Sequence, residues 1–202
     1  MATRGFFGRP PGNDVSRRLP PGQHLTDDFP VLAYGPTPRV DLAQWRFSIS
    51  HGPQLLASWN WTEFVALPPT TWRGDIHCVT QWSKFDTVWE GVTIDDLLAN
   101  AGIAPPTSFA LALSNDDYST NVPVADLVGG KAMIAIRYAG AALEAEHGGP
   151  ARLLVPHLYF WKSAKWVNGL RFTERDEPGF WERNGYHMYG DPWREQRYTD
   201  DP

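Results

Sequence analysis

Short apolar segments bounded by proline or glycine follow one another along most of this sequence. The chain holds 18 prolines and 18 glycines among 202 residues, and proline interrupts both helix interiors and central strands. A chain divided in this way is restricted to short elements. Six segments have the alternation or apolar content of strands, namely residues 45–50, 72–78, 109–113, 132–138, 152–155 and 169–173.

Two short helices are predicted from their capping residues. Asn60 and Glu63 have the spacing of a capping box at the start of the first helix. Thr93 and Asp96 begin a second helix in the same way, and Gly102 ends it. The sequence therefore predicts an α+β fold that is mixed, rich in strands and supplied with short helices.

The length fits a single domain over residues 27–202, preceded by an extended arm over residues 1–26 that is rich in glycine and proline. The first thirty residues contain no apolar run of signal-peptide length. No segment reaches the roughly 20 apolar residues that a membrane span requires. We therefore expect a cytoplasmic protein without a transmembrane segment.

Composition narrows the function classes. The net charge of -5 argues against a nucleic-acid-binding protein, which would usually be basic. Ten tryptophans indicate either an aromatic core or an exposed platform for a glycan or partner. We favour the core, because a platform would need several exposed tryptophans on one face.

Cys78 is the only cysteine and comes at the end of the predicted strand over residues 72–78. A lone cysteine cannot form an intrachain disulfide, so Cys78 is a buried small side chain, a nucleophile or a metal ligand. The neighbouring His77 would point to the opposite face of a strand. The sequence motifs of nucleotide-binding loops, zinc proteases and serine hydrolases are all absent.

A family resemblance decides among these alternatives. Cys78 with its flanks, the stretch over residues 89–98, the run over residues 147–166 and the entry segment over residues 29–38 occur in one order. Together they resemble the molybdopterin domain of the sulfite oxidase family, over about residues 29–190. The resemblance implies a sulfite-oxidase-type fold and a molybdenum cofactor held by a pyranopterin dithiolene.

The resemblance also implies roles for individual residues. Cys78 would ligate molybdenum through its thiolate, a soft ligand that suits this metal. Tyr186 would be the active-site tyrosine that donates a hydrogen bond to an oxygen, although a tyrosine packed in a C-terminal turn is an equal alternative. The residues that would bind the pterin and its phosphate are Tyr34, Asp117, His147, Arg152, Ser163, Ala164 and Lys165.

Arg152 and Lys165 could instead form a solvated surface pair. Arg152 opens an otherwise apolar Leu-Leu-Val strand, however, where an unpaired charge would be costly. We therefore favour phosphate binding for both side chains.

The sequence departs from the sulfite oxidases at the substrate site. Leu32 and Ser83 stand where that family carries the arginines that hold sulfite, so we expect sulfite to be a poor substrate. Lys84 or Arg73 could supply a replacement charge. The resemblance points to a molybdopterin-dependent oxidoreductase that transfers an oxygen atom to or from a small substrate, a sulfoxide or related oxide rather than sulfite. A haem-attachment motif is absent, so we expect a separate electron-transfer partner.

Two alternatives from other classes remain. The first is a non-catalytic, tryptophan-rich binding protein that keeps the fold. The second is a hydrolase that uses Cys78 with a distant histidine, although no local nucleophile motif supports it.

Overall fold

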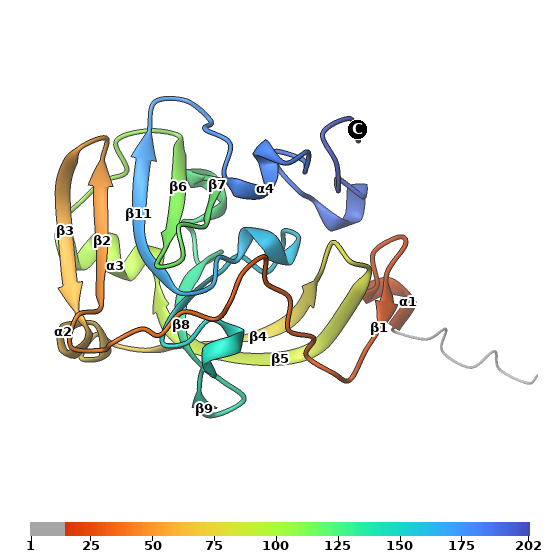
Figure 1. Ribbon diagram of the computed structural model, residues 1–202, viewed down its shortest axis with the longest axis horizontal. Helices are drawn as coiled ribbons and strands as arrows, with labels where there is room; N and C mark the ends of the chain where they lie inside the picture. The colour runs from red at the N-terminus through yellow and green to blue at the C-terminus, as the bar shows by residue number, and fades with distance from the viewer. Residues whose placement is uncertain (1–14) are drawn as a thin grey trace, which may run out of the picture.

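Two mixed β-sheets, each with parallel and antiparallel pairs, form the framework of the described chain, residues 15–202 of a computed structural model (Figure 1). The first sheet has the strand order β3-β2-β11-β6-β7. Its central strand β11 is parallel to β2 and antiparallel to β6. The five strands are β2 (Arg46–His51), β3 (Gln54–Asn60), β6 (Phe109–Ser114), β7 (Ser119–Pro123) and β11 (Val167–Thr173).

The second sheet is built around β5, a twelve-residue strand. β5 is antiparallel to both β4 and β8, and its first two residues pair in parallel with β1. β8 pairs in turn with β9 and β10. The strands of this sheet are β1 (His24–Leu25), β4 (Thr70–His77), β5 (Trp82–Thr93), β8 (Met133–Tyr138), β9 (Ala141–Ala142) and β10 (Arg152–Leu154).

The two predicted helices are confirmed with their caps. The Asn60 side chain accepts from the Glu63 amide in a complete capping box, and the Thr93 side chain accepts from the Asp96 amide. Gly102 ends the second helix in the left-handed conformation. The helical segments are α1 (Val15–Arg18), α2 (Trp61–Val65), α3 (Ile94–Ala101) and α4 (Phe180–Arg183), with 3-10 turns η1 (Val124–Asp126), η2 (Ala145–His147), η3 (Phe160–Lys162) and η4 (Pro192–Arg194).

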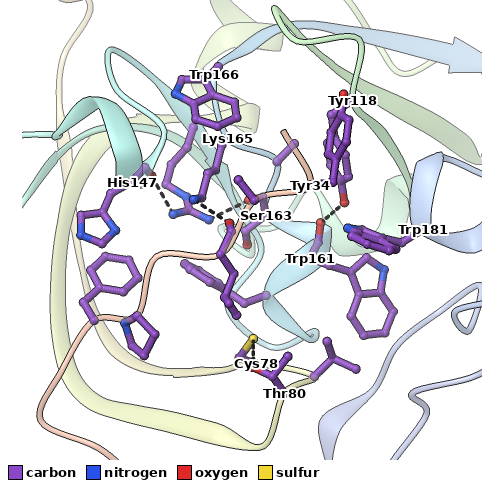
Figure 2. Close-up of a pocket in the computed structure, with 18 of the residues that line it drawn as sticks. Tyr34, Cys78, Thr80, Tyr118, His147, Trp161, Ser163, Lys165, Trp166 and Trp181 are labelled. Atoms are coloured by element: carbon purple, nitrogen blue, oxygen red, sulfur yellow. Dashed lines mark hydrogen bonds between the residues drawn. The ribbon is translucent and has the colours of Figure 1, made fainter. Parts of the chain in front are cut away.

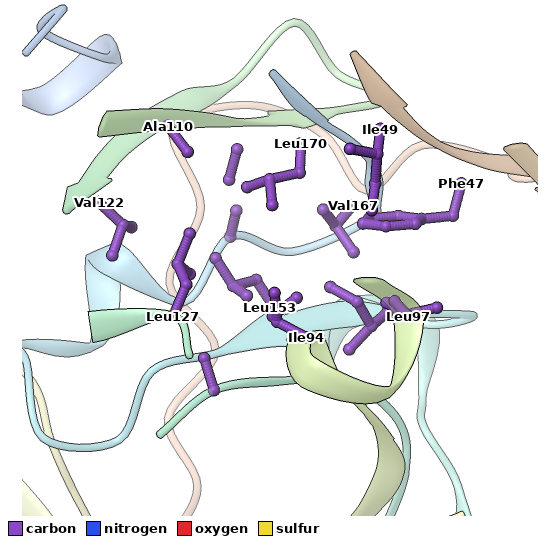
Figure 3. Close-up of a cluster of buried hydrophobic side chains, with 14 of the residues drawn as sticks. Phe47, Ile49, Ile94, Leu97, Ala110, Val122, Leu127, Leu153, Val167 and Leu170 are labelled. Atoms are coloured by element: carbon purple, nitrogen blue, oxygen red, sulfur yellow. The ribbon is translucent and has the colours of Figure 1, made fainter. Parts of the chain in front are cut away.

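The main core lies between the two sheets (Figure 3). Phe47 and Ile49 of β2 and Leu170 of β11 face Leu153 of β10 and Leu97 of α3. All five are buried, and each such side chain contributes roughly 1.5–3 kcal/mol. The core thus holds β10, which carries Arg152, against the first sheet.

Most of the tryptophans belong to the interior. Six are buried, three are partly buried, and only Trp193 is exposed, at 50%. This distribution fits the predicted aromatic core and offers no row of exposed tryptophans. The strand-rich α+β class is likewise confirmed.

The described part of the N-terminal segment contains secondary structure, whereas the sequence predicted an extended arm over residues 1–26. Residues 1–14 lie outside the described residues, while residues 15–26 contain α1 and β1. Arg18 explains this order, because its guanidinium forms ion pairs with Asp75 at 2.5 Å and Asp86 at 2.6 Å on the β4–β5 hairpin. The division at residue 26 stays a prediction. Among the described residues, none of the helices has the length and apolar character to cross a bilayer.

Candidate functional site

A cavity of about 320 Å³ lies where the second sheet meets the η3 segment and the C-terminal part of the chain (Figure 2). Its wall comes from segments that are far apart in sequence. The lining residues are Phe29, Pro30, Leu32, Ala33, Tyr34, Cys78, Val79, Thr80, Trp82, Asp116, Tyr118, His147, Arg152, Phe160, Trp161, Ser163, Ala164, Lys165, Trp166, Trp181 and Tyr186.

Cys78 occupies the turn between β4 and β5. The Cys78 amide donates to the Trp82 carbonyl at 2.8 Å, and Gln81 adopts a φ of 74° to close the turn. The Cys78 sulfur lies 3.2 Å from the Thr80 hydroxyl and the residue is 7% exposed. Burial raises the pKa of the thiol, while the Thr80 hydrogen bond opposes this shift. In the protein alone Cys78 is therefore a poor nucleophile, but a bound soft metal would hold it as the thiolate.

Arg152 is a buried cation without a counter-ion. Its guanidinium donates to the carbonyls of His147 and Ser163, both at 2.8 Å, and lies 4.1 Å from the centre of the Phe160 ring. Its buried Nε has no partner, and no carboxylate among residues 15–202 pairs with it. Burial lowers the pKa of Arg152 to about 9. An anion in the cavity would relieve this unfavourable burial.

A second cation, Lys165, and the imidazole of His147 lie beside Arg152 in the cavity wall; Figure 2 shows Lys165 and His147. The Lys165 ammonium donates to the carbonyls of Leu32 and Glu146 at 2.8 and 2.7 Å. Burial, and then repulsion by Arg152, lowers the pKa of Lys165 to about 8.

The His147 ring stacks on the Phe29 ring with 4.0 Å between the ring centres, and its buried Nδ1 has no partner. Burial, and then repulsion by Arg152, lowers the pKa of His147, which favours the neutral ring. We call Arg152 and Lys165, with the neutral His147 beside them, the cationic side.

The backbone beside the cationic side requires glycine. Gly148 has a φ of +106°, and a Cβ there would lie 3.0 Å from the Lys165 Cα and 3.1 Å from the Arg152 Cβ. A Cβ at Gly149 would lie 2.1 Å from the Leu143 carbonyl. Gly148 therefore lets the chain pack directly against Lys165 and Arg152, and Gly149 lets it pack against the Leu143 carbonyl. The unpaired Arg152 Nε and the Lys165 ammonium share a cavity with the Cys78 thiol, and this combination fits an anionic, metal-bearing group such as a phosphorylated pterin that carries a metal.

The opposite side of the cavity is aromatic (Figure 2). Tyr186 stacks on Trp181 at 4.9 Å and meets the Trp161 ring edge-on at 5.0 Å. The Tyr118 hydroxyl donates to the Trp161 carbonyl at 2.7 Å, and the Tyr34 hydroxyl donates to the carbonyl of Asp116. We call Tyr34, Tyr118, Trp161, Trp181 and Tyr186 the aromatic side. Burial raises the pKa of Tyr186, so its phenol stays protonated and can donate.

A buried ion pair supports the aromatic side. The Lys162 ammonium lies 2.6 Å from Glu182 Oε1, and both side chains are fully buried. Lys162 also donates to the Asn121 side chain and the Met188 carbonyl, each at 2.6 Å. Glu182 in turn accepts from the Trp161 indole at 2.8 Å, which fixes the orientation of that ring.

The structure brings together eight of the nine residues singled out from the sequence. Cys78, Tyr186, Tyr34, His147, Arg152, Ser163, Ala164 and Lys165 all line the cavity. Asp117 does not: it is exposed, with a φ of 63°, and the neighbouring Asp116 lines the cavity instead. The Asp116 side chain accepts from the Tyr118 amide, and its carbonyl accepts from the Tyr34 hydroxyl.

The charged residues considered near the substrate lie elsewhere. Lys84 donates to the Asp27 carbonyl, and Arg73 is exposed on β4; neither lines the cavity. Ser83 is buried and contacts His77 Nδ1 at 2.8 Å, whereas Leu32 does line the cavity. Among the described residues, 15–202, Arg152 is therefore the only arginine and Lys165 the only lysine that line the cavity.

Sequence reasoning missed most of the aromatic wall and the buried ion pair. Trp161, Trp166 and Thr80 lie within a few residues of predicted site residues, and this proximity was the only signal available. Tyr118 follows the predicted Asp117, and Trp181 lies five residues before Tyr186, so both had the same signal, but the sequence could not show that their own side chains reach the cavity.

Comparison with known proteins relates the part of the chain that contains most of the cavity residues to a family of oxidoreductases. The family model described as "Oxidoreductase molybdopterin binding domain" matches residues 34–181. The chain is 42% identical over 200 residues to "Uncharacterized oxidoreductase YuiH" of Bacillus subtilis (strain 168), covering 97% of this chain and 100% of that protein. It is 26% identical over 130 residues to "Protein-methionine-sulfoxide reductase catalytic subunit MsrP" of Burkholderia mallei, covering 57% of this chain and 39% of that protein.

A solved structure has a related fold. The sulfane dehydrogenase SoxCD from Paracoccus pantotrophus superimposes with a TM-score of 0.61 and 22% sequence identity, over 74% of this chain and 42% of that chain. The likeness establishes the fold of the domain.

Proposed function

Because the chain belongs to the family of oxidoreductase molybdopterin-binding domains, we propose that it binds a molybdenum–pyranopterin cofactor and transfers an oxygen atom to or from a small neutral substrate. Arg152 carries this proposal. The residue is 1% exposed and lines the cavity, and its guanidinium has no carboxylate partner among the described residues. Such a charge is costly unless an anion binds there.

The cationic side would hold the pterin phosphate. Arg152 and Lys165 supply charged donors, and each charge-assisted contact contributes on the order of 1.5–3 kcal/mol. Ser163 and Ala164 add a hydroxyl and backbone groups beside them. The Ser163 hydroxyl accepts from the Val155 amide at 2.9 Å, which places it firmly at this wall.

Cys78 would be the protein ligand to molybdenum. Its sulfur faces the cavity between the cationic and the aromatic sides (Figure 2). When bound, the cofactor supplies the two-electron redox change and the exchange of an oxygen atom. The chain's own residues hold the cofactor, exclude water with aromatic rings and orient the substrate.

The aromatic side would receive the substrate. Tyr186 can donate a hydrogen bond to a substrate oxygen, while Trp181 and Trp161 offer apolar faces to the rest of the molecule. A sulfoxide or related oxide meets these requirements, and the MsrP relative is named for such a substrate. Sulfite is a dianion and would find no cation on this side.

We also propose that a separate protein exchanges electrons with the site. The single cysteine faces the cavity, so it is not available to hold an iron–sulfur cluster, and the sequence has no haem-attachment motif.

Metal analysis of the purified protein tests the cofactor. We expect about one molybdenum and one pterin per chain, with a visible thiolate-to-metal absorption band. Cys78→Ser should abolish turnover and remove that band while circular dichroism is retained. A Cys78→Ser protein with full turnover, or wild-type protein expressed with molybdate but free of molybdenum and pterin, would contradict the proposal.

A second experiment tests the substrate class. Sulfite oxidation and sulfoxide reduction are compared with artificial electron carriers. The absence of charge-assisted contacts to the dianion should lower kcat/KM for sulfite roughly a hundredfold or more relative to a good small sulfoxide. Equal or better turnover of sulfite would refute the neutral-substrate assignment and leave the cofactor assignment intact.

A further inference from the structure

The turn that carries Cys78 is held by residues from both ends of the described chain. Residues 78–81 connect β4 to β5, and three of their carbonyls accept hydrogen bonds from distant segments. The Gln23 side chain donates to the Cys78 carbonyl at 3.0 Å, and the His24 amide donates to the Gln81 carbonyl at 2.8 Å. Arg197 donates to the Val79 carbonyl at 2.7 Å.

Arg197 is well placed to keep this contact. Its side chain is 10% exposed, and its guanidinium lies 4.9 Å from the centre of the Tyr159 ring. A second nitrogen lies 3.4 Å from the Pro21 carbonyl, so one planar group joins the Cys78 turn to the N-terminal segment. The Arg197 amide is anchored in turn by Asp201 at 2.8 Å.

Gln23 makes the corresponding contact from the N-terminal side. It precedes β1, which pairs in parallel with the start of β5, and its Oε1 accepts from the Ser83 hydroxyl at 3.4 Å. In Figure 1, α1 and β1 lie beside the end of β5 that leads into the turn. Gln23 and Arg197 both lie outside residues 34–181, the part that the family model matches.

We propose that Gln23 and Arg197 are positioning residues that set the direction of the Cys78 sulfur by fixing two successive carbonyls, those of Cys78 and Val79. This inference rests on the proposed role of Cys78 as a metal ligand. Residues that orient a metal ligand through hydrogen bonds typically change affinity or activity by about 10–100-fold when they are removed. Without the two donors the turn would keep its own Gln81-to-Cys78 and Cys78-to-Trp82 backbone hydrogen bonds and the β1 backbone contact, but the Val79 carbonyl would lose its side-chain donor.

The test uses Gln23→Leu and Arg197→Met, with Arg183→Met as the matched control. Arg183 also donates to a backbone carbonyl, that of Pro178 at 2.9 Å, but in the exposed part of α4. In cofactor-free protein, hydrogen exchange of the amides at residues 78–82 should be about 10-fold faster or more in the two test variants and unchanged in the control.

The loaded enzyme provides the second readout. At equal molybdenum content, the Mo(V) electron paramagnetic resonance g-values and the thiolate-to-metal band should shift in both test variants. We expect kcat to fall about 10–100-fold with a much smaller change in KM. Arg183→Met should retain the wild-type spectrum.

The outcomes separate the two proposals. Wild-type exchange rates and spectra in both test variants would overturn the positioning role while the cofactor assignment stands. If Arg197→Met fails to fold, Gln23→Leu alone decides. If wild-type protein takes up no molybdenum, the proposed function fails, and exchange in the cofactor-free protein decides whether the two side chains hold the turn.

Discussion

Two buried cations in neighbouring segments, Arg152 of β10 and Lys162 of η3, have opposite surroundings. The Lys162 ammonium has a carboxylate at 2.6 Å and further oxygen acceptors from Asn121 and Met188. Arg152 has two carbonyl acceptors, two aromatic rings and a buried Nε without a partner. Both side chains are essentially inaccessible to water.

The difference separates a structural charge from a functional one. The Lys162 charge is compensated within the protein, so its role is complete when the chain folds. The Arg152 charge is not compensated by any described residue, and it faces a cavity. Strongly perturbed ionisable groups in clefts are frequent at functional sites, whereas paired buried charges also occur as purely structural features.

The largest expected effect is on stability, at Lys162. Lys162→Met leaves the Glu182 carboxylate buried without its partner and should lower the free energy of unfolding by about 3–5 kcal/mol. Urea denaturation of cofactor-free protein measures this loss. The double variant Lys162→Met/Glu182→Leu removes both charges and should recover a large part of it. A loss below about 1 kcal/mol in the single variant would mean that the two cations do not differ in this way.

Removing the Arg152 charge should affect cofactor binding rather than stability, in contrast to Lys162. Arg152→Met removes an uncompensated charge, so the stability of cofactor-free protein should change by no more than about 1 kcal/mol. Cofactor affinity should fall about 10–100-fold, because about 1.5–3 kcal/mol of charge-assisted contact is lost. Pterin and molybdenum content per chain measure this effect.

A surface arginine provides the control for that experiment. Arg171→Met removes an exposed ion pair with Glu177 and should alter neither stability nor cofactor content appreciably. Unchanged cofactor content in Arg152→Met would refute the phosphate-binding role.

The smallest expected effect is a pH dependence from Lys165. Its pKa in the folded protein, about 8, lies below the ordinary value of 10.5. Between these values the unfolded chain binds more protons, so this group makes the stability of cofactor-free protein rise with pH above 8. Lys165→Met should show a smaller rise between pH 8 and 9.5 than wild type.

Bound cofactor should oppose this contribution of Lys165. An anion beside the ammonium favours its charged form, so the stabilisation that the cofactor gives should weaken as the pH rises above 8. Thermal unfolding of loaded and cofactor-free protein across this pH range measures the difference in their unfolding temperatures. A difference that increases with pH would show that no anion lies beside Lys165.

The capped helices and the alternating strands were predictable because their signals are local. Asn60 with Glu63 and Thr93 with Asp96 satisfy backbone donors within one turn of helix, and the structure contains both caps. β5 was not predicted as a strand, because its residues 82–87 mix buried and exposed side chains without a simple alternation. β7 was also missed, because Ser119, Thr120 and Asn121 are polar although they are buried.

Some residues of the candidate site could be predicted from local sequence, and others could not. A single cysteine and the run over residues 147–166 were visible in sequence, and both belong to the cavity. Asp117 could not be told from Asp116, since only the backbone conformation of the turn decides which of the two residues lines the cavity.

The sequence by itself determined the class of fold, the family and the local elements that present Cys78, Arg152 and Lys165. Those features depend on residues close together in the chain, where spacing fixes geometry. The tertiary structure alone decided that Arg152 has no counter-ion while Lys162 has one, and that Gln23 and Arg197 meet at the Cys78 turn. Pairing of buried charges depends on which distant segments pack together, and no local spacing encodes that.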